Sequence, residues 1–420
     1  MRIEIINTGS ELMLGRVLNT HQQWLCRQFS DLGYSVERQV AVDDSGPAIQ
    51  GAVREALSRA ELILVTGGLG PTSDDRTRDL IAALLGRKLH EDAAVVAHVE
   101  GFFASRKRPM PASTRIQAMV PEGAKVLMNA HGTAPGLAME PALGAGGSVC
   151  RLLVMLPGPP RELRPMFTGQ VVPILRERFP LSAPFVCRTL KTTGMGESQV
   201  EEKIAGSLRA LTDAGMDLGY CARIGEVDVR FVARGAAAKQ SVGEAERIVR
   251  ELLGPLVFAA DDEQLEETVV KLLTERKQTV ALAESCTGGA IADRITNVPG
   301  ASAVFLAGLV TYSNAAKQKF LGVRSETLAA HGAVSEATVR EMAEGARVAT
   351  GADYAISVTG IAGPGGGTVE KPVGTVWIGV ASAACTIAQR RFNPYDRETF
   401  KNVTSQHALD MLRRRMLGVE

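Results

Sequence analysis

Several features are scarce in this 420-residue chain, and each scarcity excludes a class of protein. Aromatic residues make up only 5% of the sequence, which argues against a surface that stacks nucleic-acid bases. The formal net charge is +1, from 47 basic and 46 acidic side chains, so no overall field attracts the chain to nucleic acid or to an anionic membrane. We therefore expect neither direct nucleic-acid binding nor membrane binding.

Paired cysteines and long apolar runs are also missing. The six cysteines stand singly, without the spacing of a zinc site or the density of a secreted disulfide scaffold. No apolar run approaches the roughly 20 residues that cross a bilayer. The first residues, MRIEIINTG, run directly into an expected strand and lack the pattern of a signal peptide. We expect a cytoplasmic protein whose thiols are reduced.

Strands and helices alternate in the first part of the chain. Residues 2–8 and 61–66 have the apolar character of buried strands, while 19–32 and 46–60 have helical spacing, with Asn19 as the expected N-cap of the first helix. This order predicts a parallel, doubly wound sheet whose strand-end loops share one edge.

A glycine-rich and acidic stretch, TGGLGPTSDD, follows the strand 61–66. Its glycines allow backbone N–H groups to face a phosphate, and neighbouring carboxylates suit a divalent cation that keeps several waters. VDDSG, at 42–46, repeats the acidic theme at an earlier strand end. The alternative is a tight turn with a pair of charges at a helix start. The residues concerned are Gly67, Gly68, Gly70, Asp74, Asp75 and Asp44.

The stretch 282–317 nominates a second chemistry. Residues 278–283 predict a strand, which places Ser285 at a strand-to-helix turn. We expect the free N–H groups of the first helical turn to point at a ligand there, with Gly288 and Gly289 allowing close approach. Tyr312 and Lys317 follow Ser285 by 27 and 32 residues, after a second expected strand at the same sheet edge.

A serine hydroxyl becomes a nucleophile when a base removes its proton, and a desolvated lysine with a lowered pKa can be that base. Tyr312 could relay the proton or steady the oxyanion. The alternative makes Ser285 and Thr287 helix caps and leaves Tyr312 and Lys317 on a solvated face. A rival nucleophile is Cys286, although no histidine lies in this stretch to activate it.

Residues 175–255 form a different kind of segment. Val227, Val229, Phe231 and Ala233 alternate with polar neighbours, which predicts a strand in a sheet with one solvated face. Flanking helical patterns indicate a small α+β domain. The only candidate for a nucleic-acid GxxG loop is Gly194-Met195-Gly196-Glu197, in which the acidic residue disfavours phosphate.

Four blocks, ESCTGG, TYSNAAK, HGAVSE and SVTGIAGPGGG with KPVGTVW, occur in order between 260 and 420. Together they resemble the C-terminal domain of the CinA family, the nicotinamide mononucleotide deamidases. The resemblance implies that Ser285, Tyr312 and Lys317 are catalytic and that no cofactor is needed. The expected substrate-binding residues, near the turn, in the glycine loop and before the last helix, are Thr287, Gly288, Gly289, Gly360, Ala362, Gly363, Gly365 and Arg397. The alternative for the glycine loop is a mobile lid.

The first segment, with TGGLGPTSDD, GTAPG and LPGPPRE, resembles the molybdopterin-binding fold of MoaB and MogA proteins in the version fused to CinA domains. That resemblance implies hydrolysis of ADP-ribose to AMP and ribose 5-phosphate with a divalent cation (Mg, Mn or Co), held by Asp74, Asp75 and Asp44. The expected nucleotide- and phosphate-binding residues are Glu11, Gly67, Gly68, Gly70, Thr72, Gly132, Thr133, Pro157 and Gly158. His21 and His131 depart from the polar residues expected there.

The resemblances imply an α/β chain of three domains: a doubly wound, three-layer MoaB/MogA-like domain (1–172), a small α+β KH-like connector (173–257) and an α/β deamidase domain (258–420). We expect a homodimeric enzyme of pyridine nucleotide salvage that acts on nicotinamide mononucleotide and ADP-ribose. Two alternatives stay open. One is a non-catalytic pterin- or nucleotide-binding adaptor in competence or the DNA-damage response, and the other is a deamidase with an inactive N-terminal domain.

Overall fold

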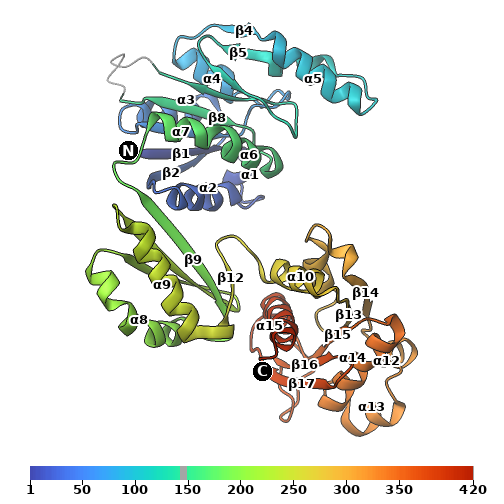
Figure 1. Cartoon of the computed structure of the whole chain (residues 1–420). Coiled ribbons are helices and arrows are strands. Elements are labelled where there is room, and N and C mark those ends of the chain that lie inside the picture. The colour runs from blue at the N-terminus through green and yellow to red at the C-terminus, as the bar shows by residue number, and fades with distance from the viewer. Residues whose placement is uncertain (142–148, 420) are drawn as a thin grey trace. The chain divides into compact units, whose positions relative to one another are not determined.

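The computed structural model describes residues 1–141 and 149–419 (Figure 1). The chain forms two compact units, Met1–Phe185 and Val186–Glu420. No helix in the described ranges is long and apolar enough to cross a membrane.

The first unit contains a six-stranded sheet in the order β2-β1-β3-β8-β7-β6. The four strands β2, β1, β3 and β8 are parallel, and β7 and β6 join antiparallel at one side. The central strand β3 reads LILVT and is buried throughout, as expected for a parallel strand covered on both faces. The strand bounds are β1 (Ile3–Thr8), β2 (Val36–Val42), β3 (Leu62–Thr66), β6 (Lys125–Leu127), β7 (Gly136–Met139) and β8 (Leu152–Leu156).

Helices cover both faces of this sheet, which gives the predicted three-layer arrangement. Leu25 and Phe29 of α2 pack on one face with α6 and α7, while Ile49 and Val53 of α3 pack on the other face with α4 and α5. Asn19 caps α2, as predicted, by accepting a hydrogen bond from the N–H of Gln22. The helices are α1 (Ser10–Met13), α2 (Thr20–Asp31), α3 (Gly46–Leu57), α4 (Thr77–Leu84), α5 (Ala93–Ser105), α6 (Pro160–Met166) and α7 (Val172–Arg178). Short elements complete the unit: the strand pair β4 (Leu89–Glu91) and β5 (Met119–Pro121), the 3-10 helix η1 (Ala112–Ala118) and the π-helical turn η3 (Phe167–Val171).

The second unit begins with a four-stranded sheet in the order β10-β11-β9-β12. Two helices pack on it, and the four residues predicted to alternate along β11 all lie in their shared core. Asp228 and Val232 of the same strand are also buried, so the alternation is less strict than predicted. The elements are β9 (Phe185–Thr193), α8 (Glu197–Asp213), β10 (Asp217–Arg223), β11 (Glu226–Arg234), α9 (Ala238–Leu253), η4 (Gly254–Leu256) and β12 (Val257–Ala260).

The rest of the second unit is built on a five-stranded sheet in the order β14-β13-β15-β16-β17. The first three strands are parallel and the last two antiparallel. Helices α10, α11 and α15 pack on one face, and α12 and α14 on the other. The strands are β13 (Val280–Glu284), β14 (Phe305–Val310), β15 (Tyr354–Gly360), β16 (Thr375–Ala381) and β17 (Thr386–Phe392). The helices are α10 (Leu265–Arg276), α11 (Ala290–Thr296), η5 (Ala301–Ala303), α12 (Asn314–Leu321), α13 (Ser325–His331), α14 (Glu336–Thr350) and α15 (Arg397–Leu417).

The parallel strands β13, β14 and β15 end at the same edge of the sheet. Ser285 follows β13, Tyr312 follows β14, and the glycine loop that begins at Gly360 follows β15. The mixed α/β class predicted from the sequence is therefore confirmed, and the strand order brings the candidate residues of the last domain to one edge.

Candidate active sites

Ser285 and Lys317 meet in the last domain. The Lys317 ammonium donates a hydrogen bond of 2.9 Å to the hydroxyl oxygen of Ser285 and a second, of 2.8 Å, to the carbonyl of Thr311. Lys317 is 1% exposed and Ser285 is 8% exposed. Strand β13, which precedes Ser285, pairs with β14, and α12 begins just after β14. Lys317 on α12 therefore lies next to Ser285, although 32 residues separate them in the chain.

Burial is the main influence on Lys317. It lowers the pKa of the ammonium below its ordinary value of 10.5, while the nearby Cys286 sulfur acts weakly in the opposite direction. No carboxylate in the described parts of the chain forms an ion pair with Lys317, so nothing of that kind offsets the cost of desolvation. The fraction of Lys317 in the neutral amine form is thus higher than for a lysine in water, and a neutral amine can accept the Ser285 proton.

Cys286 does not fit the role of nucleophile. Its side chain is 5% exposed, and burial raises the pKa of its thiol to about 12. A thiol with that pKa carries almost no thiolate near neutral pH, and the thiolate is the reactive form. The geometry favours Ser285 over its neighbour.

The helix start after Ser285 differs from the expectation. Glu284, which is 1% exposed, accepts hydrogen bonds from the N–H groups of Gly289 (3.0 Å), Ile291 (3.2 Å) and Ala292 (2.9 Å). The prediction that these N–H groups are free to face a ligand is wrong, because a buried carboxylate of the protein already satisfies them. The sequence signal was present, since an acidic residue directly precedes Ser285.

The N–H groups of Cys286 and Thr287 interact with the Cys286 sulfur and lower the pKa of its thiol, against the larger effect of burial. The N–H of Ser285 donates to the carbonyl of Val358 at 3.1 Å. Those of Cys286 and Thr287 donate to no backbone carbonyl within the described residues. They lie next to the Ser285 hydroxyl in the chain, where a developing oxyanion would need donors.

Tyr312 and Arg397 form a second pair at this site. A guanidinium N–H of Arg397 donates to the Tyr312 hydroxyl at 2.6 Å, and another donates to the carbonyl of Gly363 at 3.0 Å. Tyr312 is 60% exposed. Over the described residues no hydrogen bond joins it to Ser285 or Lys317.

These residues surround a cavity of about 280 Å³, which we call the Ser285 pocket. The predicted residues that line it are Ser285, Tyr312, Lys317, Gly360, Ala362, Gly363, Gly365 and Arg397. Thr287, Gly288 and Gly289 were expected in the wall and are not there; Thr287 is wholly buried. Ala333 and Val334, from the HGAVSE block, also line the pocket, although no individual role was predicted for them.

The first unit contains a cavity of about 520 Å³ at the ends of its parallel strands, which we call the glycine-loop pocket. Predicted residues that line it are Glu11, Asp44, Gly67, Gly68, Gly70, Asp74, Asp75, Thr133, Pro157 and Gly158. Gly68 has a φ of 65°, and a Cβ there would lie 2.1 Å from the Thr77 hydroxyl, so only glycine fits. Thr72 and Gly132 were predicted for this site and do not line the pocket.

Two of the three predicted metal ligands already accept hydrogen bonds from other residues of the first unit. The Asp44 carboxylate accepts from the N–H (2.7 Å) and hydroxyl (2.9 Å) of Ser10. The Asp75 carboxylate accepts from the N–H of Thr72 at 3.0 Å and from its hydroxyl. A hydrogen bond from Thr72 also lowers the pKa of the Asp74 carboxyl, so Asp74 is ionised at neutral pH.

The described residues contain no group of three or more histidine, cysteine, aspartate or glutamate side chains arranged to hold a metal ion. A caged metal therefore does not fit this donor set. A cation that keeps most of its waters needs only one or two carboxylates, and Asp74 with Asp44 or Asp75 would meet that requirement. The divalent-cation expectation stays a prediction.

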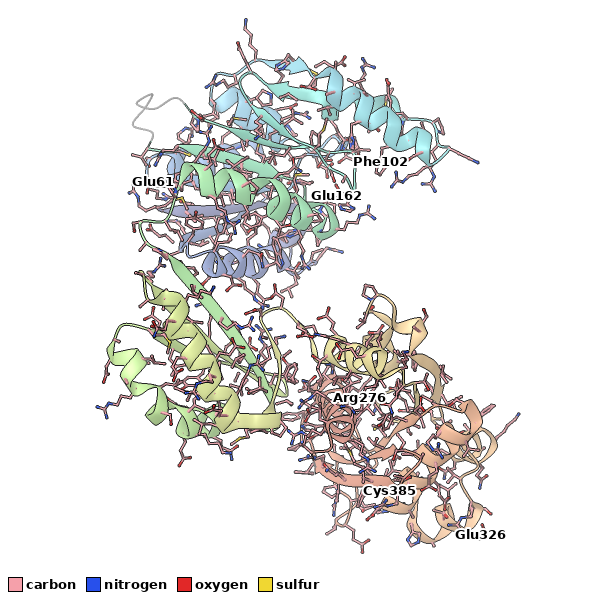
Figure 2. The ribbon with its side chains drawn as sticks, in the orientation of Figure 1. Glu61, Phe102, Glu162, Arg276, Glu326 and Cys385 are labelled. Carbon is pink, nitrogen blue, oxygen red and sulfur yellow. The ribbon has the colours of Figure 1, made fainter. Side chains whose placement is uncertain are left out.

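Two residues of the glycine-loop pocket were missed or left undecided. Glu162 of α6, labelled in Figure 2, is 7% exposed and accepts a hydrogen bond of 2.8 Å from Asn129. It closes the motif LPGPPRE, which was the available signal. His21 lines the same pocket, and one of its ring nitrogens is hydrogen-bonded to the carbonyl oxygen of Gly158. Burial lowers the pKa of this imidazole, so the ring is neutral at pH 7.

Comparisons with known proteins cover the whole chain. The CinA C-terminal domain matches residues 262–416, the probable molybdopterin binding domain matches 4–177, and the damage-inducible protein CinA KH domain matches 187–259. A CinA-like protein of Akkermansia muciniphila is 46% identical over 410 residues, which are 97% of this chain and 96% of that protein.

A putative competence-damage inducible protein of Symbiobacterium thermophilum is 43% identical over 433 residues, covering 100% of this chain and 99% of that protein. Among solved structures, the competence/damage inducible protein CihA from Agrobacterium tumefaciens is 42% identical and covers 36% of this chain and 92% of its own, with a TM-score of 0.35. The two relatives from Akkermansia muciniphila and Symbiobacterium thermophilum match 97% and 100% of this chain.

Proposed function

Since the chain belongs to the CinA family, we propose that its last domain hydrolyses the carboxamide of nicotinamide mononucleotide to give nicotinate mononucleotide and ammonia, with Ser285 as the nucleophile. One observation carries the proposal. The Nζ atom of a buried lysine lies 2.9 Å from the hydroxyl oxygen of a serine that lines a pocket.

The proton transfers follow from this pair. Neutral Lys317 takes the hydroxyl proton as the Ser285 oxygen attacks the carboxamide carbon. The oxyanion of the tetrahedral intermediate accepts a hydrogen bond from the N–H of Cys286, which lines the pocket. Lys317 returns the proton to the departing nitrogen, ammonia leaves, and an ester joins Ser285 to the nicotinate. Water, deprotonated by Lys317, then hydrolyses this ester and regenerates the serine.

Arg397 and Tyr312 serve substrate positioning in this proposal. The Arg397 guanidinium is a permanent cation in the wall of the pocket and suits the phosphate of a mononucleotide. Tyr312 accepts a hydrogen bond from Arg397 and thereby orients it. We assign the glycine loop that begins at Gly360 to the ribose phosphate, because its backbone borders the same cavity.

Ammonia release from nicotinamide mononucleotide, with a chelator present, tests the proposal. Wild type should release ammonia, and Ser285→Ala and Lys317→Ala should not. Lys319→Ala is the matched control, because Lys319 lies on the same helix and is exposed. An inactive wild type, or undiminished activity in Ser285→Ala, would refute the amidase and favour the adaptor alternative.

A second activity has its own observation. The glycine-loop pocket combines a close-packed glycine turn with three aspartates, the donor types that a diphosphate and a hydrated cation require. We propose that this pocket hydrolyses ADP-ribose to AMP and ribose 5-phosphate. Asp74 and its neighbours would hold the cation, which would neutralise the diphosphate. Titrating Mg, Mn and Co with ADP-ribose tests this, and no hydrolysis with any of them would leave a deamidase with an inactive N-terminal domain.

A further inference from the structure

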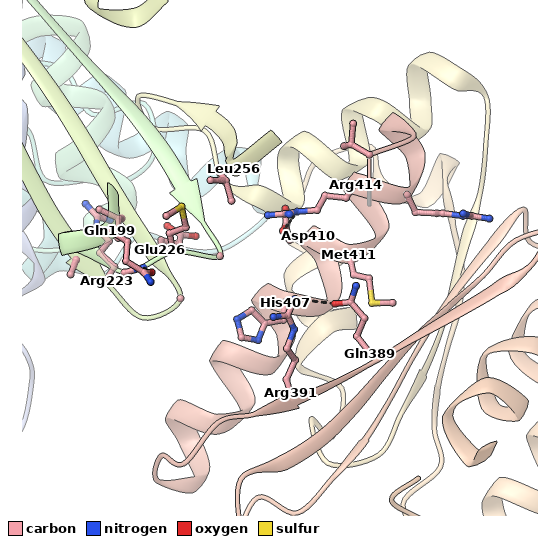
Figure 3. A pocket seen from close by; sticks show the side chains of 18 of the residues that line it. Gln199, Arg223, Glu226, Leu256, Gln389, Arg391, His407, Asp410, Met411 and Arg414 are labelled. Carbon is pink, nitrogen blue, oxygen red and sulfur yellow. Dashed lines mark hydrogen bonds and ion pairs between the residues drawn. The ribbon is translucent and has the colours of Figure 1, made fainter. Parts of the chain in front are cut away.

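The second unit contains another cavity, of about 650 Å³, which shares no lining residue with the Ser285 pocket (Figure 3). Its walls come from the turn at Gly194, the ends of β10 and β11, strand β17 and helix α15. The walls are joined directly, since the amide of Gln406 donates to the Glu226 carboxylate at 2.7 Å. We call it the Arg391 pocket.

Arginine side chains are more numerous than carboxylates among the lining residues. Three carboxylates line the cavity, and each already accepts hydrogen bonds from the protein: Glu197 from the N–H of Ala222, Glu226 from Gln406, and Asp410 from two arginines. Two of the five lining arginines form ion pairs with carboxylates outside the lining, Arg223 with Asp228 and Arg340 with Glu336. The other three are Arg391, Arg414 and Arg415.

Arg391 and His407 stand out among the lining groups. Arg391 donates to the side chain of Gln389 at 2.9 Å, and within the described ranges it forms no ion pair. The Nδ1 atom of His407 is buried and has no hydrogen-bond partner in the described part of the chain. Unpaired buried polar atoms are uncommon because they lose their bonds to water, and they therefore point to an absent partner.

The electrostatic surroundings of His407 agree with this geometry. Burial, followed by the positive charge of Arg391, lowers the pKa of the imidazole to about 4, and Arg414 acts in the same direction against Asp410. The ring is therefore neutral at pH 7. The positive electrostatic potential of Arg391 and Arg414 at this ring would stabilise a negatively charged group beside it.

We propose that the Arg391 pocket binds a small phosphate monoester through Arg391, Arg414 and His407. Such a group carries a charge of about −1.5 to −2 at pH 7, and it would supply the counter-ion that Arg391 lacks among the described residues. The planar guanidinium of Arg391 pairs with two phosphate oxygens, and the Nδ1–H tautomer of His407 donates to a third. The cavity has room for a nucleoside attached to the phosphate.

Hydrogen–deuterium exchange of the full chain with AMP, inorganic phosphate or adenosine tests the proposal site by site. AMP should slow exchange at 386–392 and 222–226, because both segments border the pocket, and adenosine at equal concentration should not. Inorganic phosphate should give the same protection at higher concentration. Peptides from residues 1–141 report separately on any binding at the glycine-loop pocket.

Arg391→Gln should raise the AMP concentration that gives half-maximal protection of these segments at least tenfold. Arg390→Gln is the matched control on the same strand, as Arg390 does not line the pocket, and it should bind like wild type. Arg391→Lys keeps the charge and should give an intermediate affinity if Arg391→Gln proves unfolded. Equal protection by AMP and adenosine, no protection by AMP, or wild-type binding by a folded Arg391→Gln would each overturn the proposal.

Discussion

In the Ser285 pocket the central charged group is Lys317, which is 1% exposed and has a serine hydroxyl and a carbonyl as its hydrogen-bond partners. In the glycine-loop pocket the carboxylates of Asp44 and Asp75 accept hydrogen bonds from Ser10 and Thr72. Desolvation without a counter-ion makes Lys317 ready to give up its proton. The hydrogen bonds of the two aspartates instead hold the loops of their pocket in place.

The comparison extends to Glu284, which belongs to the Ser285 site in space but behaves like the aspartates. It is buried, and it accepts three backbone N–H groups that would otherwise be unsatisfied. Lys317, whose pKa is lowered and which forms no ion pair within the described residues, thus lies near Glu284, a carboxylate whose hydrogen bonds hold the turn. This difference between a reacting group and a supporting group leads to four predictions, from the largest effect to the smallest.

Lys317→Arg should remove deamidase activity almost as completely as Lys317→Ala. A guanidinium keeps the positive charge but does not lose its proton in proteins, so it cannot act as a base. We expect kcat to fall by about 10² to 10⁴, the usual range for a lost general base. Lys319→Arg is the control on the exposed side of α12. Substantial activity in Lys317→Arg would mean that Lys317 contributes charge and not proton transfer.

The pH dependence of kcat/KM should report the lowered pKa of Lys317. The base must be deprotonated, so kcat/KM should rise about tenfold per pH unit below that pKa and level off above it. Since burial lowers the pKa, the plateau should begin below pH 10.5. The rising limb should be absent from the residual activity of Lys317→Ala. A plateau that starts only at or above pH 10.5 would show that the lysine is not perturbed in solution.

Glu284→Gln should affect both stability and turnover. The amide replaces one acceptor oxygen with an NH₂ group that faces backbone N–H donors, so buried hydrogen bonds are lost at a cost of about 1–3 kcal/mol. The turn that carries Ser285 should loosen, with kcat falling more than KM changes. Denaturant unfolding and steady-state kinetics measure the two effects. Glu344→Gln, on the exposed side of α14, is the control and should change neither. Unchanged stability in Glu284→Gln would contradict the capping role.

Local sequence patterns were sufficient for the elements that carry the Ser285 site. The strand expected at 278–283 corresponds to β13 (Val280–Glu284), and the strand-to-helix turn at Ser285 lies where this strand ends. Hydrophobic periodicity and the following glycines fix such boundaries, because they depend on neighbours in the chain. The resemblance to the CinA family supplied the pairing of Ser285 with Lys317, which spacing alone left open against a solvated face.

Contacts between distant segments lay beyond the sequence. Two hydrogen bonds depend on side-chain directions at strand ends. One joins the N–H of Ala292 in α11 to the Glu284 carboxylate, and the other joins Arg397 to Tyr312. The hydrogen bond from the N–H of Ser10 to Asp44 joins residues 34 apart, and no local pattern in the sequence indicates it. An aspartate in a motif looks the same whether it binds a metal or a backbone N–H group, because both uses require an ionised carboxylate.

Asp44→Asn should therefore show a small loss of stability, which sharpens the contrast with Lys317. The amide keeps one acceptor oxygen but loses the charge that strengthens the bonds to the N–H and hydroxyl of Ser10. We expect a loss of about 1 kcal/mol, or roughly 2–4 °C in the melting temperature of the first unit. Glu37→Gln is the matched control, because Glu37 is exposed and lies on β2, the strand that precedes Asp44. If Asp44→Asn melts like wild type while the cation concentration for half-maximal ADP-ribose hydrolysis rises tenfold or more, then Asp44 is a metal ligand first. In that case the hydrogen bonds that Asp44 accepts from the protein would not distinguish the glycine-loop pocket from the Ser285 pocket. The two pockets would differ only in the chemistry of their reacting groups.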